Sequence, residues 1–115
     1  SDYDAWDAAL RGNNDGADWS WNAVLPHFRG MEDNNRLNND LHGVGGRMQV
    51  SDPGHIDQMS RWFVQAVQAL GKPFNDDFNG PSQRGVGFYQ FMNRHGRRSS
   101  AAHAFLSPLD GDPRL

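Results

Sequence analysis

The spacing of apolar residues in the second half of the chain predicts an amphipathic helix. From Ile56 onward, apolar side chains recur three or four positions apart, as on one face of a helix: Met59, Phe63, Ala66, Val67 and Leu70. Polar side chains take the opposite face. Gly71 suits the position directly after a helix, and Pro73 cannot continue one. The pattern therefore predicts a helix that ends near residue 70.

The first 32 residues also carry helical patterns, interrupted by a polar loop. Residues 4–10 place apolar side chains at helical spacing, with acidic residues where a helix start favours them. Ser20 is suited to cap a short helix that runs to Leu25. Because Pro26 fits the first turn of a helix better than its interior, we expect a second helix from there to about Glu32. The apolar residues expected to form the core side of these helices are Trp19, Trp21, Val24, Leu25 and Phe28.

Two segments alternate in the manner of β-strands. Residues 43–50 alternate over a short stretch, and residues 86–92 carry aromatic side chains toward both faces. Gly85 and Gly87 leave room for something to approach the backbone closely. Residues 33–45 are polar and have no period, so they predict an exposed loop before the first strand.

The end of the chain predicts a basic turn followed by a capped helix. Residues 94–97 form the turn, and either Ser99 or Ser100 is placed to cap a helix over 101–106. Pro108 ends that helix. Together the predicted elements indicate an α+β fold, in which short helices pack with a few antiparallel strands.

The length of 115 residues suits one domain or part of one. A hydrophobic content of 37% and thirteen glycines indicate a thin core with much loop. We therefore expect a single partial domain over residues 1–115. Its expected parts are a helical part over 1–32, a loop over 33–45, a strand and helix over 46–71, and a turn, strand, turn and helix over 75–108.

Composition excludes several classes of function. The net charge of −3 and the short basic cluster do not predict nucleic-acid binding. With no cysteine, thiol catalysis and cysteine metal sites are absent. No apolar run approaches the roughly 18 residues of a membrane span, and no signal peptide opens the sequence, so the expected location is cytoplasmic or undetermined.

The sequence also contains no recognisable active site of its own. The five histidines never pair at the i, i+4 spacing of a helical metal site. The turn that starts at Asn75 resembles part of a calcium loop, but Asn75 and Val86 stand where carboxylate ligands are required. No dinucleotide fingerprint follows a strand. We therefore expect no metal and no catalytic residue in this chain.

Several blocks in a fixed order resemble a known enzyme family. The blocks are DYDAW (2–6), WSWNAVLPHF (19–28), HGVGGRMQVSD (42–52), DFNGPSQRGVGFYQ (77–90) and GRRSSAAHAFLSP (96–108). In this order they resemble the middle segment of the glucose-methanol-choline (GMC) flavoprotein oxidoreductases, as in bacterial choline and alcohol dehydrogenase members. The resemblance covers essentially the whole chain.

The resemblance implies a part of a larger, FAD-linked substrate domain, built on an antiparallel sheet flanked by helices. Family members pass a hydride from an alcohol carbon to FAD, with a histidine near the C-terminus as base. The flavin fingerprint and that histidine lie outside this sequence, so FAD is expected in the full-length enzyme only. The segment itself is expected to shape and cover the substrate cavity.

The resemblance also implies four residues that line the cavity. Phe88 and Tyr89 match a strand that passes over it, and the alternative for both is ordinary core packing. His42 and Val44 match a turn near the substrate head group in choline-type members. Because Val44 is not acidic, nothing there would pair with a quaternary ammonium, which argues against choline as substrate.

A free-standing, non-catalytic binding or interaction module that keeps the fold is the alternative function. A reading frame that continues on both sides of the segment would favour the enzyme, and natural start and stop codons at its ends would favour the module. The expected partners are the remaining parts of the flavoenzyme and a small alcohol substrate. Exposed strand edges and apolar faces also predict self-association of the isolated chain.

Overall fold

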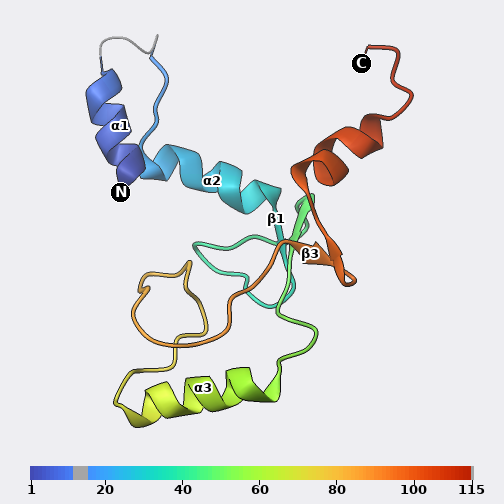
Figure 1. The fold of residues 1–115 in the computed structure, drawn as a ribbon. Helices are drawn as coiled ribbons and strands as arrows, with labels where there is room; N and C mark the ends of the chain where they lie inside the picture. Colours follow the sequence, from blue (N-terminus) through green and yellow to red (C-terminus); the bar gives the residue numbers. More distant parts are fainter. Residues whose placement is uncertain (12–15, 115) are drawn as a thin grey trace.

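The computed structural model describes residues 1–11 and 16–114, which form an open, elongated arrangement of short elements (Figure 1). In chain order the elements are α1 (Asp2–Leu10), α2 (Trp21–Met31), β1 (Glu32–Asn34), β2 (Met48–Val50), α3 (Gln58–Ala69), β3 (Asn93–Arg94), β4 (Arg97–Arg98), the π-helix η1 (Ala102–Leu106) and the 3-10 helix η2 (Ser107–Leu109). The predicted α+β class is confirmed. The radius of gyration is 18.2 Å, whereas a compact domain of this length has about 13 Å.

The N-terminal helices meet through an aromatic cluster and two carboxylates. The rings of Tyr3 and Trp6 lie 5.3 Å apart, and Tyr3 also contacts Phe28 at 5.7 Å. Asp7 is buried and accepts the Trp19 backbone N–H at 3.1 Å. The cluster is nevertheless half open, since Trp6 and Phe28 are 55% and 42% exposed. Of the residues predicted for the core side, Trp19 and Phe28 are therefore exposed, whereas Trp21, Val24 and Leu25 are half-buried.

Helix α2 is one continuous helix, which corrects the prediction of two. Pro26 lies inside it, and Ser20 makes no side-chain cap. Instead, Asp4 of α1 accepts the Trp21 N–H at 2.9 Å, so a tertiary contact supplies the cap. A proline in a helix removes the single hydrogen bond to the carbonyl four residues earlier, here that of Asn22. The turns on either side of Pro26 stay helical.

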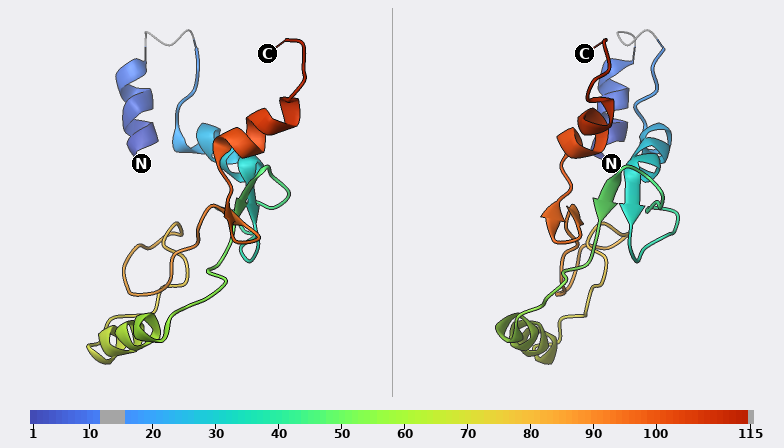
Figure 2. Two further views of the ribbon diagram at one scale, coloured as in Figure 1. Left: turned by 45° about the vertical axis from the view of Figure 1, so that its right-hand side comes forward. Right: turned by 90° about the vertical axis from the view of Figure 1, so that its right-hand side faces the viewer.

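Strand β1 lies where the sequence predicted a loop. It pairs with β2 in parallel, with Glu32 opposite Met48 and Asn34 opposite Val50, whereas antiparallel pairing was expected. The two strands run side by side in Figure 2. Strand β1 consists of polar residues, so no alternation of apolar and polar side chains marks it in the sequence. Its side chains form hydrogen bonds instead of packing in an apolar core. Asp33, for example, accepts hydrogen bonds from the Gly45 N–H at 2.9 Å and the Gln49 side chain at 3.1 Å.

The predicted strand over residues 86–92 is also corrected. The segment makes only single-residue bridges, Val86 with Phe74 and Phe91 with Ser51. A strand needs a continuous partner, and none of the described residues supplies one between these two bridges. Regular pairing begins directly afterwards in the β3–β4 hairpin, whose turn places His95 and Gly96 at positive φ (49° and 76°), as a tight hairpin turn requires.

Helix α3 confirms the clearest sequence prediction. Asp57 caps it by accepting the Met59 N–H at 2.8 Å, and Gly71 follows it at φ +81°. The helix stands apart from α1 and α2, at the far end of the molecule (Figure 1). Among the described apolar residues only three are buried: Val64, Val86 and Ala104. The apolar face of α3 is therefore formed as predicted but mostly uncovered.

The two serines near the end of the chain have different roles. Ser100 caps the C-terminal helical segment by accepting the His103 N–H at 3.2 Å. Ser99 is buried and accepts the Gln49 N–H at 3.2 Å, which ties this segment to β2. No helix among residues 1–11 and 16–114 is long and apolar enough to cross a membrane.

Candidate functional site

An apolar groove separates α3 from the segment 87–91. Its volume is about 600 Å³, within the range of small-molecule sites. The lining residues are Pro53, His55, Ile56, Met59, Ser60, Phe63, Val64, Gly87, Phe88, Tyr89 and Phe91. None of them is acidic, and most are aliphatic or aromatic. The groove therefore offers a water-excluding surface rather than a reactive centre.

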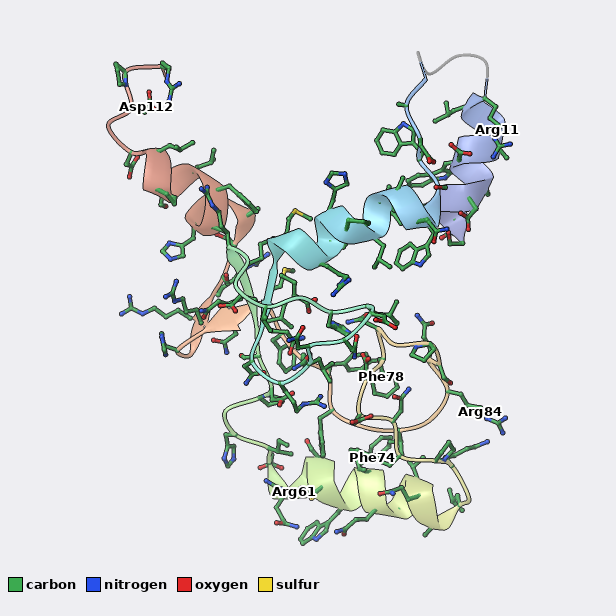
Figure 3. All side chains as sticks on the ribbon, turned by 180° about the vertical axis from the view of Figure 1, so that it is seen from behind. Arg11, Arg61, Phe74, Phe78, Arg84 and Asp112 are labelled. Carbon is green, nitrogen blue, oxygen red and sulfur yellow. The ribbon has the colours of Figure 1, made fainter. Side chains whose placement is uncertain are left out.

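The wall of this groove opposite α3 is held by an aromatic stack. The ring of Tyr89 stacks on that of Phe78 with centroids 4.6 Å apart and an interplanar angle of 29°. Behind it the backbones approach closely, since a Cβ at Gly87 would collide with the carbonyl oxygen of Asn75. The close approach expected at Gly87 is thus made by a neighbouring turn of the same chain. In Figure 3, Phe78 lies in the loops beside α3.

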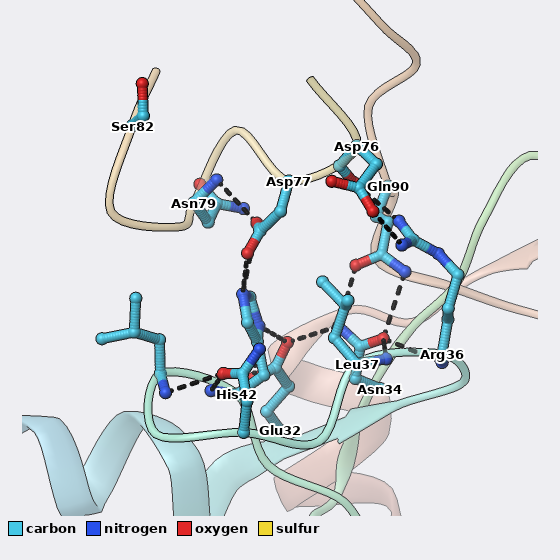
Figure 4. Close-up of polar contacts among 12 residues, drawn as sticks. Glu32, Asn34, Arg36, Leu37, His42, Asp76, Asp77, Asn79, Ser82 and Gln90 are labelled. Carbon is cyan, nitrogen blue, oxygen red and sulfur yellow. Dashed lines mark hydrogen bonds and ion pairs between the residues drawn. The ribbon is translucent and has the colours of Figure 1, made fainter. Parts of the chain in front are cut away.

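A buried histidine lies between two carboxylates (Figure 4). His42 Nδ1 lies 3.0 Å from Glu32 Oε1, and Nε2 lies 3.2 Å from Asp77 Oδ2. The three side chains are 6%, 16% and 17% exposed, for His42, Glu32 and Asp77 respectively. Burial raises the pKa of Glu32, but hydrogen bonds from Asn34, His42 and the Gly43 N–H together hold that pKa below its ordinary value.

Asn34 joins this cluster to a second polar network. Its side-chain nitrogen donates to Glu32 at 2.9 Å and to Gln90 at 2.8 Å. Gln90 in turn donates to Asp52 at 3.0 Å. Arg36 pairs with the same Asp52 carboxylate at 2.9 Å and donates to the backbone carbonyl of Asp76 at 2.8 Å. Segments far apart in sequence are therefore locked together by polar side chains rather than by apolar burial.

Comparisons with known proteins identify the family of the chain. Residues 1–111 match the model of a family described as GMC oxidoreductase. This chain belongs to the GMC oxidoreductase family.

Two relatives and a solved structure show which proteins this GMC segment is similar to. An alcohol dehydrogenase (acceptor) of Pseudomonas putida is 40% identical over 115 residues, covering 99% of this chain and 20% of the relative. An oxygen-dependent choline dehydrogenase of Rhizobium etli is 34% identical, over 78% of this chain and 16% of the relative. A crystal structure of pyridoxine 4-oxidase from Mesorbium loti superposes with a TM-score of 0.79 at 29% identity, over 99% of this chain and 22% of that one. The chain thus spans about a fifth of the length of the relatives it matches.

The four cavity residues predicted for this GMC segment do not gather at one place. Phe88 and Tyr89 lie in the groove beside α3. His42 belongs to the buried cluster and lines a different hollow, of about 380 Å³, under α1 and α2. Val44 is 53% exposed and lines neither hollow.

Sequence reasoning missed Glu32 and Asp77. Glu32 is an ordinary residue at the end of a predicted helix, and Asp77 lies in a stretch of turn-forming residues. His42 meets them across 10 and 35 positions of the chain. No local spacing connects such residues. The only available signal was that Asp77 and His42 fall within family-like blocks, and Glu32 lies outside all of them.

The glycine-rich loop over 43–46 does not fit the phosphate-binding turn of a flavin site, because a Cβ on Gly43 would collide with the Arg29 carbonyl and a Cβ on Gly46 with the Met31 carbonyl. These glycines therefore permit close packing against the end of α2 and are not free to approach a phosphate. Within residues 1–11 and 16–114, no three His, Asp or Glu side chains are placed to hold a metal ion.

Proposed function

We propose that this chain is the segment of an FAD-dependent alcohol oxidoreductase that shapes and covers the substrate cavity. Membership in the GMC family and similarity to alcohol and choline dehydrogenases support the reaction class. In the full-length enzyme, FAD bound by other parts of the protein would supply the capacity to accept a hydride from the alcohol carbon. The contribution of this segment is positioning and exclusion of water.

The groove between α3 and the segment 87–91 is the observation that carries the proposal. Its lining joins Phe88 and Tyr89, two of the four residues that the family resemblance assigned to the cavity, with the apolar face of α3. A wall of this kind removes water from the reacting carbon and restricts its orientation. The stack between Phe78 and Tyr89 keeps one aromatic ring of that wall in place.

The lining also favours a neutral alcohol over a cationic one. No carboxylate is among the groove residues, and Val44 supplies none in the neighbouring turn. A substrate with a quaternary ammonium would therefore lack a charge partner from this segment. We expect the enzyme to prefer neutral, apolar primary alcohols to choline, which a comparison of kcat/KM for the two substrate classes measures.

The experiment replaces Phe88 or Tyr89 by alanine in the full-length flavoenzyme. We expect KM for the alcohol to rise about tenfold, equivalent to about 1.4 kcal/mol of lost binding. The flavin absorption spectrum is expected to stay unchanged, since the glycine-rich loop of this segment does not fit the phosphate-binding turn of a flavin site.

Trp62→Ala is the matched control. Trp62 is an aromatic residue of α3 that is 56% exposed and does not line the groove. The Trp62→Ala variant should leave KM for the alcohol unchanged. If Phe88→Ala and Tyr89→Ala both keep the wild-type KM and kcat, the groove is not part of the substrate cavity and the proposal fails.

A further inference from the structure

The buried cluster around His42 contains more acceptors than a neutral histidine can serve. Each ring nitrogen lies within 3.2 Å of a carboxylate oxygen, Nδ1 facing Glu32 and Nε2 facing Asp77. A neutral imidazole has one N–H and one lone pair, whereas an imidazolium has two N–H donors. With a neutral ring, one carboxylate would therefore face a lone pair in a buried site.

No other cation is placed to satisfy these carboxylates. None of the described lysine or arginine side chains bonds Glu32 or Asp77, and the nearest arginine network, that of Arg36, is directed at Asp52 and Asp76. The hollow beside His42 adds Tyr3 from α1 as a titratable group, and otherwise apolar and amide side chains. The histidine ring is thus the positive partner that the geometry offers to both acids.

We propose that His42 is a doubly protonated positioning residue, which fastens the 75–80 turn to β1 and thereby holds the aromatic wall of the groove. The positioning role rests on the proposed function of that groove. The doubly donating ring bonds Glu32 at the start of β1 and Asp77 in the turn.

The fastening reaches the groove through two short routes. Asp77 directly precedes Phe78, whose ring stacks on Tyr89 at 4.6 Å. On the other side, Gln90 follows Tyr89 and is bonded by Asn34, which also bonds Glu32. Phe78 and Tyr89 are therefore each one residue away from a side chain, Asp77 or Gln90, that is bonded into the cluster around His42.

The variant Asp77→Asn separates charge from structure. In the wild type, Asp77 Oδ1 accepts the Asn79 N–H at 3.0 Å, while Oδ2 faces His42. The introduced amide can keep the first bond with its oxygen and donate its N–H to a neutral His42. His42 in this variant needs only one N–H, which it donates to Glu32. Asp77→Ala removes both contacts, and Asp40→Asn is the matched control, because Asp40 is an exposed acid of the same loop as His42 with no contact to the ring.

The test is made on the full-length flavoenzyme with 15N-labelled histidine and with a neutral primary alcohol as substrate. At neutral pH, the ring nitrogens of His42, assigned by their absence in His42→Gln, should both be protonated in the wild type and in Asp40→Asn. In Asp77→Asn only one should be. Asp77→Ala should raise KM about tenfold, because both contacts that fasten the turn are lost. Asp77→Asn and Asp40→Asn should keep KM near the wild-type value.

Two results would overturn the inference. A singly protonated His42 ring in the wild type at neutral pH would show that the ring does not donate to both carboxylates. A doubly protonated ring, with Asp77→Ala keeping the wild-type KM, removes the positioning role. Failure of the proposed function is seen separately, because Phe88→Ala and Tyr89→Ala would then leave KM unchanged, while the nitrogen spectra would still report the state of His42.

Discussion

Helix α3 and the cluster around His42 differ in how they are stabilised. Helix α3 has a regular apolar period and a local cap, yet Met59 and Phe63 on that face are 67% and 65% exposed. The cluster has no sequence pattern, yet His42 is 5% exposed and bonded on both sides. A well-formed element is therefore not the same as a well-packed one. In this segment polar bonds hold the described loops together, while the most regular helix presents its apolar face outward.

The variant Glu32→Ala tests the stabilising role of the cluster around His42, and we expect it to have the largest effect. The change leaves His42, the Asn34 amide and the Gly43 N–H without their shared acceptor. Removing one partner of a buried charged pair costs about 3–5 kcal/mol of stability. Because Glu32 is partly exposed, we expect the free energy of unfolding to fall by about 3 kcal/mol. The free energy of unfolding of the full-length enzyme in urea measures it. Asp110→Ala, at an exposed acid, should change that free energy by less than about 0.5 kcal/mol. An equal effect of the two variants would show that the cluster is not a structural centre.

The outward face of α3 gives the next prediction. We propose that the isolated 115-residue chain self-associates through this face, because a contiguous apolar surface is costly in water. Phe63→Lys should weaken association about tenfold, or about 1.4 kcal/mol, as measured by sedimentation equilibrium. Gln65→Lys adds the same charge to α3 at a residue that does not line the groove. Equal weakening by both variants would point to charge repulsion rather than to the apolar face.

The smallest effect concerns the start of α3. Asp57→Ala removes the side-chain acceptor of the Met59 N–H and should cost about 1 kcal/mol. Asp57→Ser retains an acceptor and should recover most of that loss. Urea unfolding of the full-length enzyme, compared with Glu32→Ala, measures whether local capping is indeed the weaker contribution. A loss as large as that of Glu32→Ala would remove the distinction between the two regions.

Local chemistry was enough to predict α3, its end at Gly71 and a serine cap at 99 or 100. The structure then decided that Ser100 is the capping serine and that Asp57 caps α3. The same reasoning failed at Ser20, because the start of α2 is capped instead by Asp4, 17 positions away from the Trp21 N–H that it accepts. It also failed for the expected strand over 86–92, whose aromatic alternation has no continuous partner among the described residues.

The sequence by itself determined the fold class and the family, whereas the place of Phe88 and Tyr89 in the groove beside α3 comes from the tertiary structure. Only the tertiary structure decided that β1 is a polar parallel strand, and that His42 lies between Glu32 and Asp77 rather than beside Phe88. The physical reason is distance along the chain. Helix periods and caps are set by neighbours, whereas a buried ion cluster depends on loops that bring together residues separated by 35 positions.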